Sequence, residues 1–172
     1  DLLVLDMAAT THYKDKIGMG DMSTFQQFMD HSNPRQLMRN ALFVNSGTPR
    51  FLESAWLSGV AGSDWSWAVK LNDFDNDGHT DVFITNGMSA DIRNPDAPPN
   101  SLVGREEWDY YRKSGLQKET NLAFRNLGDL RFENVASAWG LDHLGSSYAS
   151  ASGDLDRDGD IDLVVASLDE QV

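Results

Sequence analysis

Apolar and polar residues alternate near the middle of the chain. Trp65, Trp67, Val69 and Leu71 are apolar, and small or polar residues stand between them. This period of two is typical of a β-strand with one buried face, so residues 65–71 are predicted to form a strand. Short runs rich in β-branched and aromatic residues predict further strands over residues 42–45, 50–54, 82–85, 122–126 and 131–135. The pattern therefore indicates an all-β fold.

The chain also repeats itself. Residues 40–87 align with residues 121–168 without a gap. Identical pairs across this alignment include Asn40 with Asn121, Phe43 with Phe124, Asn45 with Asn126, Gly47 with Gly128, Phe51 with Phe132 and Gly59 with Gly140. Each repeat reads, in order, as a strand, an acidic loop, a second strand, an insertion and a hairpin. Internal repeats of this length are typical of propellers and other repeat architectures.

Two acidic loops, residues 73–81 and 154–162, occupy the same place in the two copies. Each carries aspartate at loop positions 1, 3, 5 and 9 and glycine at position 6; the aspartates are Asp73, Asp75, Asp77 and Asp81 in the first loop and Asp154, Asp156, Asp158 and Asp162 in the second. Two carboxylates about 5 Å apart repel each other by about 3 kcal/mol at an effective dielectric constant of ~20. A bound divalent cation would turn this repulsion into attraction.

The donor atoms of these loops indicate which cation they would take. Ligands that are all oxygen favour Ca²⁺, Mg²⁺ or Mn²⁺ over Zn²⁺ or copper, and a dense, flexible carboxylate loop suits the six to eight ligands of Ca²⁺. A solvated acidic turn without metal is one alternative, and an Asp-x-Asp nucleophile of the phosphatase type is another. Neither explains why the loop recurs in a repeat, so two calcium sites are the prediction.

Four antiparallel strands per repeat, in tandem, are typical of β-propeller blades. We therefore expect an all-β, partial β-propeller of four-stranded antiparallel blades with short helical insertions. Residues 62–141 would form one complete blade, residues 1–61 strands two to four of the preceding blade, and residues 142–172 the first half of the next. A propeller ring closes with about four to eight blades, so the chain is expected to be a segment of a longer protein. A compact two-sheet sandwich is the alternative architecture.

The two insertions, residues 7–39 and 88–120, both fall between the second and third strand of a repeat. In the first, residues 23–26 read as a helix capping box and residues 33–38 as a short second turn. In the second, residues 105–113 are predicted to be helical. Insertions on one rim of a scaffold often carry binding, although they could equally pack over the blade and shield its edge.

Composition excludes several classes of function. The 172 residues carry a net charge of −13, which argues against nucleic acid and anionic membranes as partners. No apolar run approaches the ~20 residues that a membrane-spanning helix needs. The chain has no cysteine, and it shows no Ser/His/Asp set and no glycine-rich phosphate loop. The protein is therefore predicted not to be an enzyme.

The loops and the segments around them resemble a known family. The acidic loops between two strands, the pattern Asn-x-x-Phe-x-Asn-x-Gly at residues 40–47 and 121–128, and the run Asp-Trp-Ser-Trp at residues 64–67 are similar to the FG-GAP/VCBS repeat family. This family comprises calcium-loop propellers related to the integrin α-subunit head, and the chain is also similar to secreted bacterial proteins related to cartilage acidic protein.

The resemblance implies a ligand set for each loop. It implies that the four aspartate side chains of each loop bind Ca²⁺ together with the backbone carbonyl at position 7, which belongs to His79 in the first loop and to Asp160 in the second. Asp1 is expected to be position 9 of a third loop of this kind, whose earlier residues would precede the chain.

Two hypotheses for function follow. The first is a calcium-stabilised segment of an extracellular, periplasmic or cell-surface protein that serves adhesion, ligand binding or scaffolding, with neighbouring blades of the longer protein as partners and a protein or glycan as ligand. Export is inferred from the metal, because weak calcium modules with Kd of about 10⁻⁴–10⁻³ M are extracellular. The second is a lectin or lyase whose carbohydrate site is lined by Trp108, Tyr110 and Tyr111.

Overall fold

The structure is a computed structural model that describes residues 1–18, 31–33, 37–90 and 105–168. It is predominantly β, with antiparallel sheets, as predicted. Its strands are β1 (Leu2–Val4), β2 (Ala41–Asn45), β3 (Phe51–Glu53), β4 (Ser66–Asn72), β5 (Asp81–Asn86), β6 (Glu119–Thr120), β7 (Leu122–Asn126), β8 (Phe132–Asn134), β9 (Leu144–Gly145), β10 (Ser147–Gly153) and β11 (Asp162–Ser167). Its helices are α1 (His12–Gly18), α3 (Ala55–Ser58) and α4 (Arg105–Ser114).

All six strands that the sequence predicted are present, each within one residue or two of its predicted ends. The predicted helix over residues 105–113 is confirmed as α4. Helix α1 was not predicted. The predicted capping box at residues 23–26 lies outside the described residues, and so does part of the turn predicted over residues 33–38.

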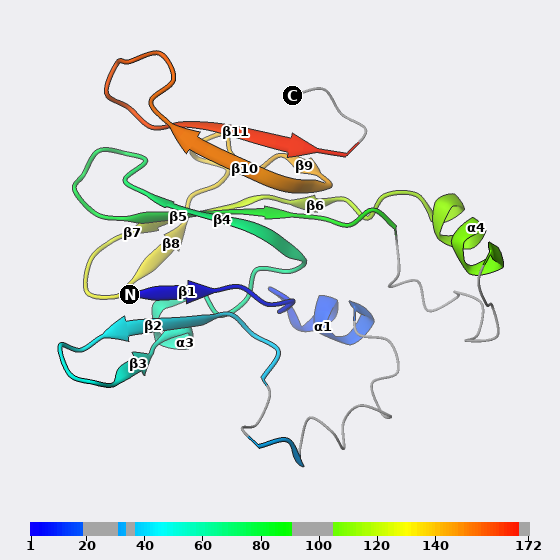
Figure 1. Cartoon of the computed structure of the whole chain (residues 1–172), viewed down its shortest axis with the longest axis horizontal. Coiled ribbons are helices and arrows are strands. Elements are labelled where there is room, and N and C mark those ends of the chain that lie inside the picture. The colour runs from blue at the N-terminus through cyan, green and yellow to red at the C-terminus, as the bar shows by residue number, and fades with distance from the viewer. Residues whose placement is uncertain (19–30, 34–36, 91–104, 169–172) are drawn as a thin grey trace.

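The strands form three larger sheets and one small one. The four-stranded sheet has the order β4-β5-β7-β8, all antiparallel, and it contains the acidic loop between β4 and β5. A three-stranded sheet β1-β2-β3 precedes it, a two-stranded sheet β10-β11 follows it, and β6 pairs with β9. Figure 1 shows the three larger sheets lying one above another, with both acidic loops at one end and helix α4 at the other. Among the described residues no sheet closes on itself, so the ring remains a prediction.

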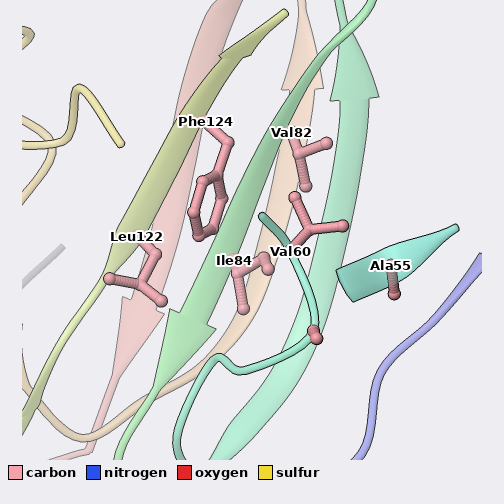
Figure 2. Close-up of a cluster of buried hydrophobic side chains, with 7 residues drawn as sticks. Ala55, Val60, Val82, Ile84, Leu122 and Phe124 are labelled. Carbon is pink, nitrogen blue, oxygen red and sulfur yellow. The ribbon is translucent and has the colours of Figure 1, made fainter. Parts of the chain in front are cut away.

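The central strands of the middle sheet, β5 and β7, carry its buried residues, because that sheet lies between the other two. All six residues of β5 are buried. On one face, Val82 and Ile84 join a cluster with Leu122, Phe124 and residues of the connection after β3, against which residues of the first sheet pack. Figure 2 shows these side chains gathered with Val60 and Ala55. Each such side chain contributes about 1.5–3 kcal/mol to stability when it is fully buried.

The other face of β5 turns towards the last sheet. Phe83 forms a second buried cluster with Ala123 and Ala136, and Leu163 and Val165 of β11 pack against it. Between the same two sheets the ring of Trp67 on β4 stacks on the ring of Tyr148 on β10, with the ring centroids 4.4 Å apart. A strand that alternates between two neighbouring sheets in this way explains why residues 82–84 of β5 are apolar without a break.

The sequence repeat is also a structural repeat. Asn40 and Asn121, which align in the two copies, are both fully buried just before the third strand. Oδ1 of Asn40 accepts a hydrogen bond of 2.8 Å from the backbone nitrogen of Asp6, and Oδ1 of Asn121 accepts one of 3.0 Å from that of Asn86. Each asparagine therefore ties the end of the second strand to the start of the third.

The two insertions meet at Lys14 of α1. Its Nζ lies 2.7 Å from Oδ2 of Asp64, which precedes β4, and 2.7 Å from Oε2 of Glu119 on β6. Both carboxylates are buried. Burial by itself lowers the pKa of Lys14, but its hydrogen bonds to the two carboxylates and the charges of those carboxylates outweigh burial and leave the pKa raised. In the part of the chain that the structure describes, no helix has the length and apolar character needed to cross a bilayer.

Candidate metal sites

Both acidic loops fold around their first aspartate. The oxygens of Asp73 accept hydrogen bonds from the backbone nitrogens of Asp77, at 3.0 Å, and Gly78, at 2.8 Å. The oxygens of Asp154 accept bonds from Arg157, at 2.7 Å, and Gly159, at 3.2 Å. The bond from the position-6 glycine is therefore common to both loops, whereas the other donor is position 5 in the first loop and position 4 in the second.

The glycine of each loop is required by the backbone. Gly78 has φ +87° and Gly159 has φ +98°, both in the region that glycine enters without steric cost. Position 4 of each loop is left-handed as well, with φ 59° at Asn76 and 69° at Arg157. The two loops therefore share one backbone conformation, and glycine at position 6 permits the turn.

The aspartate at position 9 closes each loop. Oδ2 of Asp81 accepts a hydrogen bond of 3.0 Å from the backbone nitrogen of Phe74, and Oδ2 of Asp162 accepts one of 2.8 Å from that of Leu155. Asp81 is fully buried and begins β5. This carboxylate therefore joins the loop to the strand that follows it.

Asp81 also ties its loop to the third strand. Its Oδ1 accepts a hydrogen bond of 2.8 Å from the backbone nitrogen of Asn126, at the end of β7. At the start of the chain, Oδ1 of Asp1 accepts one of 2.7 Å from the backbone nitrogen of Asn45, which aligns with Asn126. Asp1 thus stands in the same relation to its sheet as Asp81, and its place in a third loop stays a prediction.

Three predicted ligands of each loop come together. One oxygen from each of Asp73, Asp75 and Asp81 lies within 4.8 Å of the others, and the same holds for Asp154, Asp156 and Asp162. These two triads could hold a metal ion.

The aspartates at position 5 lie outside the triads. Oδ1 of Asp77 accepts a hydrogen bond of 2.9 Å from the backbone nitrogen of His79, and Oδ1 of Asp158 accepts one of 2.9 Å from that of Asp160. These contacts orient position 7, whose carbonyl was predicted to be a ligand. The ligand roles of these four residues remain predictions.

The first triad fits a hard cation. Oδ1 of Asp75 is buried and has no hydrogen-bond partner, although a buried carboxylate oxygen needs one. Burial raises the pKa of Asp81, and the neighbouring charges of Asp75 and Asp77 raise it further, against the lowering effect of its two backbone hydrogen bonds. A divalent cation among these oxygens would give Oδ1 of Asp75 its missing partner. Its positive charge would also lower the pKa of Asp81, which burial and the neighbouring carboxylates raise.

Arg125 is the residue at this site that sequence reasoning missed. Its Nε lies 2.6 Å from Oδ2 of Asp75, and its Nη2 donates a hydrogen bond of 3.0 Å to Oδ2 of Asp77. The hydrogen bond from His79 and, after it, the one from Arg125 keep the pKa of Asp77 below its ordinary value. Arg125 aligns with Val44 in the preceding copy, so the repeat carried no signal for it. In the sequence, the one indication is that Arg125 stands next to Asn126, which the repeat aligns with Asn45.

The first loop has an arginine paired with two of its carboxylates, and a hydrogen bond also joins the two loops. Among the described residues, no lysine or arginine pairs with a carboxylate of the second loop. The side-chain nitrogen of Asn76, in the first loop, donates a hydrogen bond of 2.8 Å to Oδ1 of Asp160 in the second. Close by, the side-chain nitrogen of Asn72 donates one of 2.7 Å to Oγ of Ser152, so β4 and β10 are linked as well.

A separate cavity of about 630 Å³ lies beside the first insertion. Trp56 of α3 lines it and is 74% exposed, and His12, Asp15 and Arg39 contribute polar groups. The aromatic residues expected to line a carbohydrate site lie elsewhere, on α4. Tyr110 is partly buried there, and the side chains of Trp108 and Tyr111 fall outside the described residues.

Comparison with known proteins does not add to this picture. No protein-family model matches the chain, and no curated protein matches it. Function is therefore argued from the repeated loops, the contacts around them and the stacking of the sheets.

Proposed function

We propose that the chain is a calcium-binding segment of a β-propeller of the FG-GAP/VCBS type, in a secreted or cell-surface protein, and that it acts as a non-enzymatic adhesion, ligand-binding or scaffold module. The observation that carries this proposal is the repeated loop. Positive φ at positions 4 and 6, a bond from the position-6 glycine to the first aspartate, a bond from position 2 to the ninth aspartate and a carboxylate triad occur in both loops, each time between two antiparallel strands.

The stacking of the sheets supports the propeller. Val82 and Ile84 of β5 turn towards the preceding sheet, where they are buried. Leu2 and Val4 occupy the matching positions on β1 but are 54% and 45% exposed. An apolar sheet face of this kind is suited to a further blade, packed as the middle sheet packs on the first. Consecutive blades stacked in this direction would build a ring.

Calcium would act here as a structural ion. Each loop gathers carboxylates that repel one another, so the ion-free loop opposes the fold and the loaded loop supports it. An ion that binds only the folded state stabilises it by about 2.7 kcal/mol per site at 100 times its Kd. The proposed role is therefore to hold the first two strands of each blade together where calcium is abundant.

Calorimetric titration with calcium, together with melting curves in chelator and in calcium, tests this proposal. The wild-type chain should bind two ions and melt several degrees higher with calcium. Asp75→Asn and Asp156→Asn, which keep the shape of the side chain, should each remove one ion, and the double variant should remove both. An equal concentration of magnesium is the control for non-specific ionic effects. A chain whose heat of titration and melting curve ignore calcium would contradict the proposal.

The cavity beside the first insertion favours one alternative, a glycan-binding module. Its volume lies in the range of small-molecule pockets, and an exposed tryptophan beside charged side chains is a surface on which a sugar ring can stack. Binding on a glycan array that Trp56→Ala abolishes, with the calcium response intact, would support this alternative. Binding that survives Trp56→Ala would remove the cavity from consideration.

A further inference from the structure

The two oxygens of Asp75 have different surroundings. Oδ2 forms an ion pair with Arg125, 2.6 Å from Nε and outside hydrogen-bond geometry, whereas Oδ1 is buried without a hydrogen-bond partner. Asp75 also belongs to the triad whose oxygens lie within 4.8 Å of one another. The carboxylate of Asp75 is therefore held by Arg125 at Oδ2, and its Oδ1 is left available to a cation.

We propose that Arg125 is a positioning residue for the first calcium site. It holds Asp75 and Asp77 through one oxygen each and so leaves Oδ1 of Asp75 to the ion. This inference rests on the proposed calcium function and deepens it, because it makes the first loop better organised for the ion than the second.

The opposite role, a built-in competitor for the ion, fits the geometry less well. In the described part of the chain the contacts of Arg125 are with Asp75 and Asp77, and the carboxylates of Asp73 and Asp81 accept backbone hydrogen bonds instead. Of the three triad carboxylates, the guanidinium thus contacts that of Asp75 alone, and it does so through Oδ2. Its side chain is 40% exposed, so solvent screens its repulsion of an ion.

Holding the loop matters because its carboxylates repel one another when no ion is bound. A guanidinium that bridges two of them reduces this repulsion and keeps both carboxylates in place before the ion arrives. Groups that orient metal ligands from outside typically account for 10- to 100-fold in metal affinity. The second loop has no such bridge among the described residues, so it is expected to bind calcium more weakly.

The experiment isolates the first loop in an Asp156→Asn background and measures its calcium affinity by calorimetry. Arg125→Met and Arg125→Lys are compared with the parent, and Arg131→Met is the matched control, because Arg131 is 71% exposed and pairs with Asp129 rather than with a carboxylate of either loop. Both Arg125 variants should weaken binding roughly 10- to 100-fold, because lysine keeps the charge but lacks the rigid, planar set of donors with which arginine fixes the orientation of Asp75 and Asp77. Arg131→Met should stay within about twofold of the parent.

Melting curves in chelator show that each variant is folded, and Arg125→Lys keeps the test open if Arg125→Met does not fold. Unchanged or tighter binding in Arg125→Met would overturn the inference, and so would full affinity in Arg125→Lys, which would leave charge as the sole contribution. These results leave the proposed function standing, because the parent still binds calcium. If the wild-type chain bound no calcium, the proposed function and this inference would both be overturned.

Discussion

Asn76 and Asp160 join the two acidic loops by a hydrogen bond of 2.8 Å from the asparagine side-chain nitrogen to Oδ1 of the aspartate. The two residues are 84 positions apart and belong to loops on different sheets. Asp160 stands at position 7, whose carbonyl is a predicted calcium ligand. A change at Asn76 in the first loop can therefore reach a ligand of the second.

The first prediction follows from this contact. Asn76→Gly removes the side chain and keeps the positive φ, so it should weaken calcium binding in the second loop about two- to fivefold, as expected for one hydrogen bond of about 0.5–1 kcal/mol. The affinity is measured by calorimetry in an Asp75→Asn background, which disables the first loop. Asn72→Ala is the control, because it breaks a bond of 2.7 Å between the same two strand pairs without touching a loop ligand. Equal affinities with and without Asn76 would show that the loops act independently.

The second prediction separates a carboxylate that holds the fold from one that serves the ion. Asp81→Asn should lower the free energy of unfolding in chelator by about 1–3 kcal/mol, because both oxygens of Asp81 accept backbone hydrogen bonds and an amide can replace only one. Asp75→Asn should cost less than about 1 kcal/mol under the same conditions, since Oδ1 of Asp75 has no partner to lose.

Both variants should abolish calcium binding in the first loop. Urea unfolding in chelator and calorimetry with calcium give the two quantities. Equal losses of stability for Asp75→Asn and Asp81→Asn would contradict the division of roles.

The third prediction concerns Lys14, which joins the two insertions through Asp64 and Glu119. Lys14→Met should lower the free energy of unfolding by about 3 kcal/mol, because it leaves two buried carboxylates without their cation. Lys113→Met on the exposed face of α4 is the control and should stay within about 0.5 kcal/mol of wild type. Chemical unfolding measures both, and similar values for the two variants would mean that Lys14 does not stabilise the junction.

The fourth prediction is a pH dependence at Glu53. A hydrogen bond from Arg39 is the main cause that lowers the pKa of Glu53 from 4.5 to about 2, against the opposing effect of burial. Since the pKa is depressed in the folded state, the stability that ionised Glu53 contributes is present above pH 4.5 and is lost as the pH falls towards about 2.

The difference in melting temperature between wild type and Glu53→Gln, in chelator, should therefore be largest above pH 4.5 and shrink below it. Comparing the two proteins at each pH cancels the titration of the other carboxylates. A melting-temperature difference that does not change with pH would show that Glu53 does not stabilise the fold through its charged pair with Arg39.

The strands and the loop chemistry could be predicted because both depend on residues close in sequence. The alternation at residues 65–71 correctly predicted the strand β4. It was wrong about a single buried face, because Trp67 and Leu71 are exposed and the register of β4 shifts between Ser66 and Val69. The hydrogen bonds that shape the first loop around Asp73 span four and five residues, so the spacing of Asp73, Asp77 and Gly78 is enough to specify them. The repeat then indicated that the second loop would fold alike. It does share the bond from the position-6 glycine to the first aspartate, but its other bond to that aspartate comes from Arg157 at position 4.

Helix α1 was not predicted, because it depends on contacts with residues far away in the sequence. Its seven residues are too few to show a clear helical period, and a helix this short has little stability without tertiary contacts. Lys14 supplies one such contact through Asp64 and Glu119, which lie 50 and 105 residues away.

By itself, the sequence determined the β-rich fold, the strand order within a repeat and two carboxylate loops suited to a cation, because these follow from period, turn chemistry and charge spacing over short distances. Only the tertiary structure decided which side chains complete and connect the loops. Arg125 reaches Asp77 across 48 residues, and Asn76 reaches Asp160 across 84. Such contacts depend on how sheets stack and on where a strand ends beside a loop. No local pattern encodes either, because the packing of the whole chain fixes both.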